Sequence, residues 1–203
     1  MFFMYKEYFG FSEEPFEINP DPRFLYMTPT HTGAMSSMIA GIRERKGITV
    51  VSGDVGTGKT VLVYALLKDL SDKIKTAFIF HTTVGFEDLL RDVMQELGEK
   101  IVRDDLTSLI IQFQLYMEER MARDETVAII IDEGQDLRSD VIEKLFRLFI
   151  RETPGAKLIQ ILLIGQPELE TKLDTVELQA FKGYVTTRYR IDTLNEKECQ
   201  EYI

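Results

Sequence analysis

The chain of 203 residues contains one cysteine, two histidines and no tryptophan. Its single cysteine, Cys199, cannot form an internal disulfide or a thiolate metal site, and two histidines do not make a metal-ligand cluster. Proline is scarce as well, with 6 residues, and the charged fraction of 29% is that of an ordinary globular protein. These shortages exclude a disulfide scaffold and a cysteine-rich metal centre, and they indicate a packed fold instead of a disordered chain.

Long apolar runs are also missing. The longest, residues 127–131 and 161–164, have the length of a strand, whereas a membrane-spanning helix needs about 20 apolar residues. The first residues lack the basic and apolar regions of a secretory signal. We therefore expect no membrane segment in this chain and a cytoplasmic location; any inner-membrane anchor of a longer natural protein would lie outside residues 1–203.

The charge balance is acidic, with a formal net charge of −10 from 24 basic and 34 acidic residues. Such a charge repels a phosphate backbone at long range, and the sequence contains no local basic patch that would offset it. The charge therefore gives no strong signal for a nucleic-acid partner.

From residue 48 onward, short β-branched runs alternate with amphipathic helical patterns. The runs occupy residues 48–52, 76–81, 127–131, 158–164 and 188–192. Each run is apolar enough to be buried on both faces, which is typical of parallel strands between two layers of helices. The pattern predicts an α/β fold with one five-stranded parallel sheet.

The start of the chain differs from the rest, because it holds four of the six prolines, many aromatic residues and no clear strand. We interpret residues 1–47 as an irregular collar in front of a core that spans residues 48–194. A further helical pattern begins at Asn195.

Three apolar residues of the collar have two possible roles. Phe24, Leu25 and Tyr26 follow Pro22, which fixes the direction of the chain. They either form an apolar wall against an adenine base or pack into the core.

Residues 53–60 read Gly-Asp-Val-Gly-Thr-Gly-Lys-Thr, the P-loop pattern, between an apolar run and a helical pattern. In a P-loop, backbone N–H groups and the N-terminus of the following helix surround an anion. Lys59 would reach the β- and γ-phosphates of ATP, and Thr60 would bind Mg²⁺. The expected nucleotide-binding residues are Gly53, Asp54, Val55, Gly56, Thr57, Gly58, Lys59, Thr60, Val61 and Asp132.

A second motif is the apolar run at 127–131, which ends in two carboxylates, Asp132 and Glu133, as a Walker B strand does. Because ligands bind beyond the carboxyl ends of parallel strands, Asp132 is expected to face the same crevice as the P-loop. Asp132 would hold Mg²⁺ together with Thr60, and Glu133 would orient the water that attacks the γ-phosphate. The alternative is that both carboxylates simply end a strand.

Two further runs end in polar side chains. Gln166 follows the run at 158–164 and is a candidate sensor of the γ-phosphate, although polar residues are common at strand ends. His81 ends the run at 76–81, and it either contacts Glu133 or has a structural role.

Several segments together resemble the AAA+ ATPases of the general secretion pathway protein A (ExeA-like) family. They are residues 8–26, His31 with Ala34, residues 53–60, residues 132–135 and residues 165–169. The resemblance covers nearly the whole chain. It implies a three-layer P-loop NTPase core with sheet order 5-1-4-3-2, ATP-dependent self-association and contact with secretion-machinery proteins. It also implies that residues 195–203 begin a lid domain that is mostly absent.

Two positions depart from the family pattern. Tyr184 stands where the family has an arginine that would be supplied to a neighbouring subunit, so Arg188, or less favourably Lys182, is the expected substitute. The alternative for Arg188 is a solvated charge at a strand start. His81 stands where the family has an asparagine. Both departures predict slow hydrolysis.

These patterns favour an ATPase core in which Lys59, Glu133, Gln166 and Arg188 are the catalytic candidates. Two alternatives stay open. One is an AAA+ ATPase that acts on DNA in transposition or replication, which salt-dependent DNA binding would favour. The other is a switch that binds ATP with little turnover.

Overall fold

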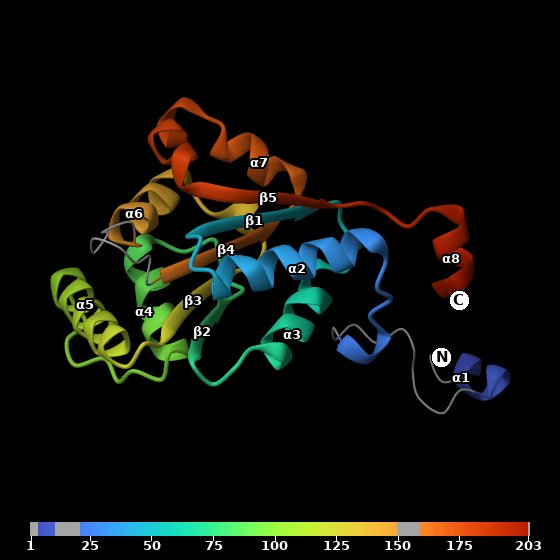
Figure 1. The fold of residues 1–203 in the computed structure, drawn as a ribbon, viewed down its shortest axis with the longest axis horizontal. Helices are drawn as coiled ribbons and strands as arrows, with labels where there is room; N and C mark the ends of the chain where they lie inside the picture. Colours follow the sequence, from blue (N-terminus) through green and yellow to red (C-terminus); the bar gives the residue numbers. More distant parts are fainter. Residues whose placement is uncertain (1–3, 11–20, 150–158, 203) are drawn as a thin grey trace.

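The computed structural model describes residues 4–10, 21–149 and 159–202. Its centre is one sheet with the strands β1 (Ile48–Gly53), β2 (Ile74–Ile79), β3 (Thr126–Ile131), β4 (Ile159–Gly165) and β5 (Val185–Ile191). The strand order is β2-β3-β4-β1-β5, and every neighbouring pair is parallel. Read from the other edge, this is the predicted order 5-1-4-3-2, so the predicted α/β fold is confirmed (Figure 1).

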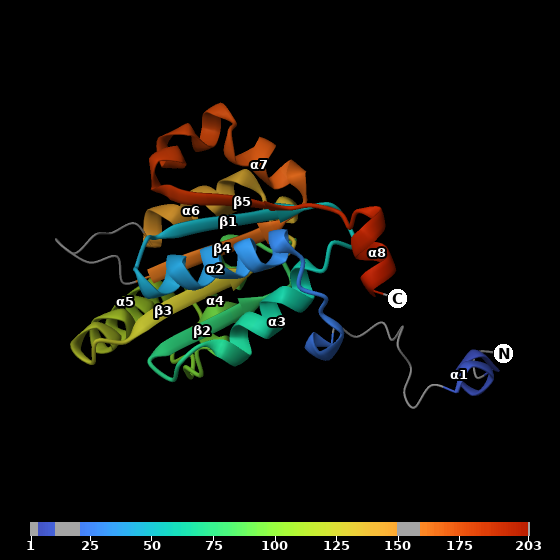
Figure 2. The same ribbon diagram turned by 45° about the vertical axis from the view of Figure 1, so that its right-hand side comes forward.

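Helices cover both faces of the sheet (Figures 1 and 2). The helices of the described residues are α1 (Met4–Phe9), α2 (Pro29–Arg43), α3 (Lys59–Asp69), α4 (Phe86–Glu96), α5 (Leu106–Ala122), α6 (Ser139–Phe149), α7 (Pro167–Leu173) and α8 (Glu196–Tyr202). Short 3₁₀ segments are η1 (Pro22–Phe24), η2 (Gly134–Asp136) and η3 (Val176–Tyr184). Apolar residues of α2 and α3 pack on one face, and those of α4, α5 and α6 pack on the other.

The central strand β3 shows why the strands are unbroken apolar runs in the sequence. Val127, Ile129 and Ile131 pack in the core cluster that includes α4, α5 and α6. Ala128 and Ile130 pack in the opposite cluster with α2 and α3, and all five side chains are 0% exposed. Because successive strand residues point to opposite faces, a strand that is covered on both sides must be apolar at every position.

The expectation of an irregular collar is wrong for residues 29–43, which form α2. Thr28 caps this helix, because its hydroxyl oxygen accepts a hydrogen bond from the His31 N–H at 3.3 Å, and a proline follows in the first turn. Gly33 lets the helix lie against β5, since a Cβ there would come 1.9 Å from the Tyr189 hydroxyl oxygen. The helix is thus one of the covering layers of the sheet.

Two strands have different bounds from those predicted. β2 is Ile74–Ile79 and not 76–81, because its first residues pair with the start of β3. β5 is Val185–Ile191 and not 188–192, because its β-branched first residues pair with β1. Residue 158 of the predicted fourth strand lies outside the described residues.

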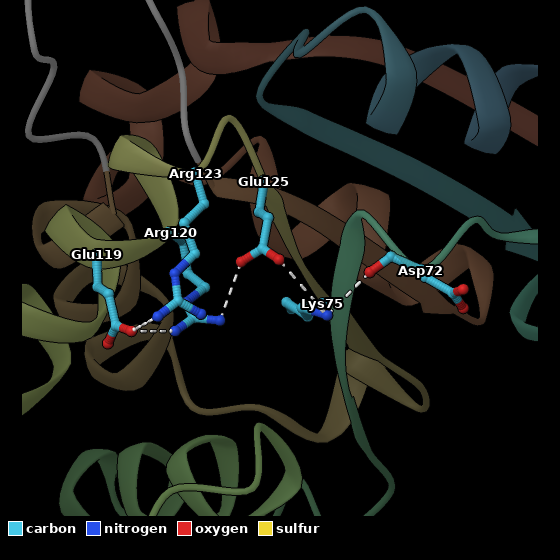
Figure 3. Close-up of polar contacts among 6 residues, drawn as sticks. All are labelled: Asp72, Lys75, Glu119, Arg120, Arg123 and Glu125. Carbon is cyan, nitrogen blue, oxygen red and sulfur yellow. Dashed lines mark hydrogen bonds and ion pairs between the residues drawn. The ribbon is translucent and has the colours of Figure 1, made fainter.

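A network of ion pairs joins the end of α5 to the starts of β2 and β3 (Figure 3). Arg120 Nη2 lies 2.8 Å from Glu119 Oε1, and Arg120 Nη1 lies 2.9 Å from Glu125 Oε2. Glu125 Oε1 lies 3.7 Å from Lys75 Nζ, which also donates to the Asp72 carbonyl oxygen at 2.9 Å. The network stands at the amino ends of the strands, so it belongs to the edge of the sheet opposite the predicted site.

The helix predicted from Asn195 onward is present as α8. The Glu198 N–H donates to Asn195 Oδ1 at 3.0 Å, which makes Asn195 the cap of the helix. Tyr26 holds α8 in place, because its hydroxyl donates to the Glu201 carboxylate and its ring centroid lies 6.1 Å from that of Tyr202. The domain boundaries around α8 stay predictions. Among the described helices, none is both long enough and apolar enough to cross a membrane.

Candidate functional site

The candidate site lies at the carboxyl edge of the sheet, where three neighbouring strands end. β4 pairs with β1 on one side and with β3 on the other. The loop after β1 is the P-loop, β3 leads into Asp132 and Glu133, and β4 leads into Gln166. The topology therefore brings the three motifs predicted from the sequence to one edge, as ligand sites of open parallel sheets require.

The P-loop has the backbone geometry of an anion cradle. Gly56 and Gly58 adopt the left-handed conformation, with φ of 82° and 78°, which non-glycine residues rarely adopt. Gly58 is the N-cap of α3, so the first N–H groups of this 11-residue helix point into the loop. The loop is closed by Thr57, whose hydroxyl donates to the Asp54 carbonyl oxygen at 2.8 Å. The backbone N–H groups of such a loop and the positive end of a helix together suit a phosphate group.

Lys59 is buried against the loop that it follows, with 7% of its surface exposed. Its Nζ donates to the carbonyl oxygens of Gly53 and Asp54, both at 2.8 Å. Burial lowers the pKa of Lys59, while the nearby carboxylates of Glu133 and Asp132 act in the opposite direction. The ammonium group therefore stands between the P-loop and the two carboxylates, where a phosphate would give it a strong partner.

Thr60 and Asp132 meet across the site. The Thr60 hydroxyl donates to Asp132 Oδ2 at 2.6 Å, and the Glu133 N–H donates to Asp132 Oδ1 at 2.9 Å. The carboxylate is 1% exposed, and burial raises the pKa of Asp132. A buried carboxylate beside a hydroxyl oxygen is an oxygen donor pair that fits Mg²⁺, which binds through one or two carboxylates, waters and substrate phosphates.

These two oxygen groups would supply only part of the ligands that a metal ion needs. Within residues 4–10, 21–149 and 159–202, no group of three or more His, Cys, Asp or Glu side chains could hold a metal ion. The donor set therefore fits an ion that arrives with a nucleotide, since the remaining ligands would be phosphate oxygens and water.

Glu133 has an unusual backbone conformation, with φ 50° and ψ 40°. A non-glycine residue in this region costs about 1–3 kcal/mol, and such strain persists only where the surroundings fix it. Thr82 supplies one restraint, because its hydroxyl donates to the Glu133 carbonyl oxygen at 3.1 Å. A second restraint acts on the side chain, whose Oε2 accepts a hydrogen bond from Gln135 Nε2 at 2.6 Å.

The expectation that His81 ends the second strand is wrong, because β2 ends at Ile79 and His81 is exposed beyond it. The neighbouring residue, Thr82, makes the contact with the Glu133 backbone. We therefore assign the contact with the Glu133 carboxylate to Gln135 and not to His81.

Gln166 is the N-cap residue of α7, and Pro167 follows in the first turn. The backbone N–H of Gln166 donates to Gln135 Oε1 at 2.9 Å. Gln166 is half-buried at the same edge as the P-loop. The role of its side chain as a phosphate sensor stays a prediction.

Arg188 lies in the middle of β5, opposite Val50 of β1, and not at a strand start as predicted. Its Nη2 lies 3.0 Å from Asp174 Oδ1, and Lys182 Nζ lies 3.1 Å from the same oxygen. The Arg188 guanidinium, followed by the Lys182 ammonium, lowers the pKa of Asp174. Tyr184 packs against the core. Both candidate substitutes for the missing arginine are thus paired within this chain, and their role toward a neighbour stays a prediction.

The collar residues lie beside the P-loop. Leu25 packs against the core cluster of α2 and α3, and its Cδ1 lies 4.0 Å from where a Cβ on Gly58 would be. Phe24 is 38% exposed, and Tyr26 contacts α8. The position of Leu25 is compatible with packing into the core and with contact to an adenine base. The contact with adenine therefore stays a prediction.

His31 is a residue whose role the sequence analysis did not identify. It is 4% exposed, and its Nε2 lies 2.8 Å from the Thr57 carbonyl oxygen in the P-loop. A carbonyl only accepts, so Nε2 carries the proton, and Nδ1 accepts from the Thr28 hydroxyl at 2.6 Å. The residue joins α2 to the P-loop, and only its place in the family resemblance marked it in the sequence.

The strand order of the sheet and the P-loop together show that this chain has the fold of a P-loop ATPase. Residues 42–173, more than half of the chain, match the model of the AAA domain family, so the chain belongs to that family. It is 32% identical over 203 residues to the general secretion pathway protein A of Aeromonas hydrophila, covering 98% of this chain and 37% of the relative. The chain thus spans little more than a third of the length of that relative.

Solved structures with the same fold include the following three proteins. The ORC2 protein of Aeropyrum pernix, in ADPNP and ADP complexes, has a TM-score of 0.70 and 14% identity, over 93% of this chain and 54% of that one. Cdc6p of Pyrobaculum aerophilum has a TM-score of 0.66 and 18% identity, over 88% and 49%. A Walker-type ATPase of Pyrococcus abyssi has a TM-score of 0.62 and 13% identity, over 93% and 60%. At these identities the likeness shows the fold alone.

Proposed function

We propose that this chain is the ATP-binding core of an AAA-type ATPase that hydrolyses ATP to ADP and phosphate with Mg²⁺. One observation carries the proposal: the hydroxyl of Thr60, which follows the P-loop lysine, lies 2.6 Å from the carboxylate of Asp132 at the end of β3. Two sequence motifs 72 residues apart thus form a single oxygen site beside the Lys59 ammonium group. Phosphate and magnesium recognition require this juxtaposition.

Each residue of the site has a role in this proposal. The N–H groups of the P-loop and of the first turn of α3 bind the phosphates, and Lys59 turns from its carbonyl partners to the β- and γ-phosphates. Thr60 and Asp132 hold Mg²⁺, which supplies charge neutralisation on the phosphates. Glu133 orients the attacking water for in-line transfer. Gln166, at the end of the neighbouring strand, senses the γ-phosphate.

The pathway is proposed from the relative. The 32% identity to general secretion pathway protein A supports a role in a general-secretion-type system, in which the ATPase faces the cytoplasm and drives assembly of secretion-machinery proteins. We propose that copies of the chain associate when ATP is bound, and that residues 195–203 begin the lid of the ATPase. Arg188, released from Asp174, would be the arginine that one copy supplies to the next.

Phosphate release tests the proposed reaction. Glu133→Gln keeps the size of the side chain but removes the carboxylate, so we expect the steady-state rate to fall by about 100-fold or more. The control is Glu143→Gln on α6, where the side chain pairs with Arg147 at the surface, and we expect it to have the parent rate. Equal rates for the parent and Glu133→Gln would show that Glu133 does not take part in the reaction.

The DNA-directed alternative is tested separately. Structures with the same fold include a Drosophila ORC bound to DNA, at a TM-score of 0.63 and 18% identity, which bears on the fold only. The formal charge of −10 disfavours a phosphate backbone as partner. A salt-dependent affinity for duplex DNA at physiological ionic strength would favour this alternative over the secretion role.

A further inference from the structure

The side chain of Gln135 forms a bridge between two strand ends of the site. It lies in η2, directly after β3, and its Nε2 donates to Glu133 Oε2 at 2.6 Å. Its Oε1 accepts from the backbone N–H of Gln166 at 2.9 Å. One amide therefore joins the carboxylate after β3 to the turn after β4.

The orientation of this amide follows from its partners. A backbone N–H only donates, so the atom that faces Gln166 must be the carbonyl oxygen of Gln135. An ionised carboxylate only accepts, so the atom that faces Glu133 must be the amide nitrogen. Rotating the amide by half a turn would place like groups together at both ends. The two partners thus require the same orientation of the Gln135 amide, so the hydrogen bond at one end fixes the atom that is presented at the other.

The surroundings hold the bridge tightly. A Cβ on Gly165 would come 2.6 Å from Gln135 Oε1, so only glycine lets the amide reach the turn after β4. Lys172 of α7 holds η2 from the other side, because its Nζ donates to the carbonyl oxygens of Gln135 and Leu137, the latter at 2.7 Å. Gln135 is half-buried, which limits competition from water.

We propose that Gln135 is a positioning residue for hydrolysis: its amide fixes the Glu133 carboxylate and couples it to the turn that carries Gln166. This inference rests on the proposed ATPase function. Gln135 bonds only one carboxylate oxygen, Oε2, which leaves Oε1 to the attacking water. A movement of the turn after β4, where the γ-phosphate would be sensed, is transmitted to the carboxylate through a single side chain.

Two variants distinguish the hydrogen bond to Glu133 from the hydrogen bond to Gln166. Gln135→Leu removes both hydrogen bonds at similar size. Gln135→Glu keeps an oxygen that accepts from the Gln166 N–H, but it places a second carboxylate against Glu133, which repels it. In both variants we expect kcat to fall by about 10- to 100-fold, the usual effect of a misplaced reactive group. KM and the Kd for ATP should stay within about twofold of the parent, because Gln135 makes no bond to the P-loop in the described structure.

Hydrogen exchange at the backbone N–H of Gln166 measures whether the Gln135 bridge is formed, and this measurement does not require ATP hydrolysis. In Gln135→Leu this N–H loses its acceptor, so we expect exchange about three- to tenfold faster. In Gln135→Glu the acceptor remains, and we expect the parent rate of exchange. The matched control is Gln112→Leu on α5, since the Gln112 amide also bridges two backbone groups, Val102 N and Lys100 O, far from the site. This control should change neither kcat nor exchange at Gln166.

The outcomes distinguish this inference from the proposed function. An unchanged or higher kcat in both Gln135 variants, in a parent protein that hydrolyses ATP, would overturn the positioning role. A fall in kcat accompanied by an equal loss of ATP affinity would also overturn it, because a general structural defect acts on both. If the parent protein does not hydrolyse ATP, the proposed function is contradicted. The bridge is then tested by hydrogen exchange alone, and an unchanged exchange rate of the Gln166 N–H in Gln135→Leu would refute it.

Discussion

Replacing His31 by phenylalanine should loosen the P-loop without creating a large cavity. The imidazole is 4% exposed, and its Nε2 donates to the Thr57 carbonyl oxygen at 2.8 Å. A phenyl ring fills a similar volume but donates no hydrogen bond. Thr28 keeps other partners, because its hydroxyl lies 3.0 Å from Thr30 Oγ1. The carbonyl of Thr57 is therefore the group that loses its buried partner.

The magnitude follows from that one group. A buried acceptor left without a partner costs about 1–3 kcal/mol, so the free energy of unfolding should fall by that amount. For a domain of this size, each kcal/mol lowers the melting temperature by about 2–4 °C. The loop must then be ordered when the nucleotide binds, and we expect the affinity for ATP to fall by about 5- to 30-fold, which corresponds to about 1–2 kcal/mol.

Urea denaturation and titration calorimetry measure the two effects. His31→Gln serves as the comparison, because its amide can still donate to the Thr57 carbonyl, and we expect it to lie between the parent and His31→Phe. If His31→Phe unfolds at the parent urea concentration and binds ATP with the parent affinity, then the bond from α2 does not support the P-loop.

Two further predictions concern buried polar groups. Thr49 Oγ1 is buried with no hydrogen-bond partner among the described residues, so Thr49→Val should raise the free energy of unfolding by about 1 kcal/mol in urea denaturation; a less stable variant would show that the hydroxyl has a partner. Asp132 has a raised pKa in the folded protein, so its contribution to stability is lost as pH rises from the ordinary value of 3.8 through the folded pKa. Asp132→Asn should therefore be more stable than the parent at pH 7 without nucleotide, and this gain should disappear below about pH 4. A gain that persists at pH 3 would contradict the sign of the shift.

The sequence predicted the sheet because each strand is buried on both faces. Ile129 and Ile130 of β3 face opposite layers, and this requirement produces an apolar run that is visible without any structure. Strand ends were less predictable, because β5 extends back to Val185 through pairing with β1, which a local pattern does not reveal.

The site was predictable in its motifs and not in its connections. Lys59, Thr60 and Asp132 could be placed because the P-loop and a carboxylate after a buried strand have fixed roles in parallel sheets. The bonds made by His31 and Gln135 depend on residues 26 and 31 positions away in the chain, and no spacing rule marks such contacts. The helix α2 was missed because its cap signal, Thr28 followed by proline, lies in a segment rich in prolines and aromatic residues.

The most direct test of the central claim is calorimetry of Mg²⁺ and ATP binding by the parent and by Lys59→Ala. The parent should bind ATP, and Lys59→Ala should show no measurable affinity while retaining its circular dichroism spectrum, because the Lys59 ammonium lies at the P-loop and makes its bonds to loop carbonyls. Equal affinities in the two proteins, or no binding by the parent, would contradict the assignment of residues 53–60 as the phosphate site.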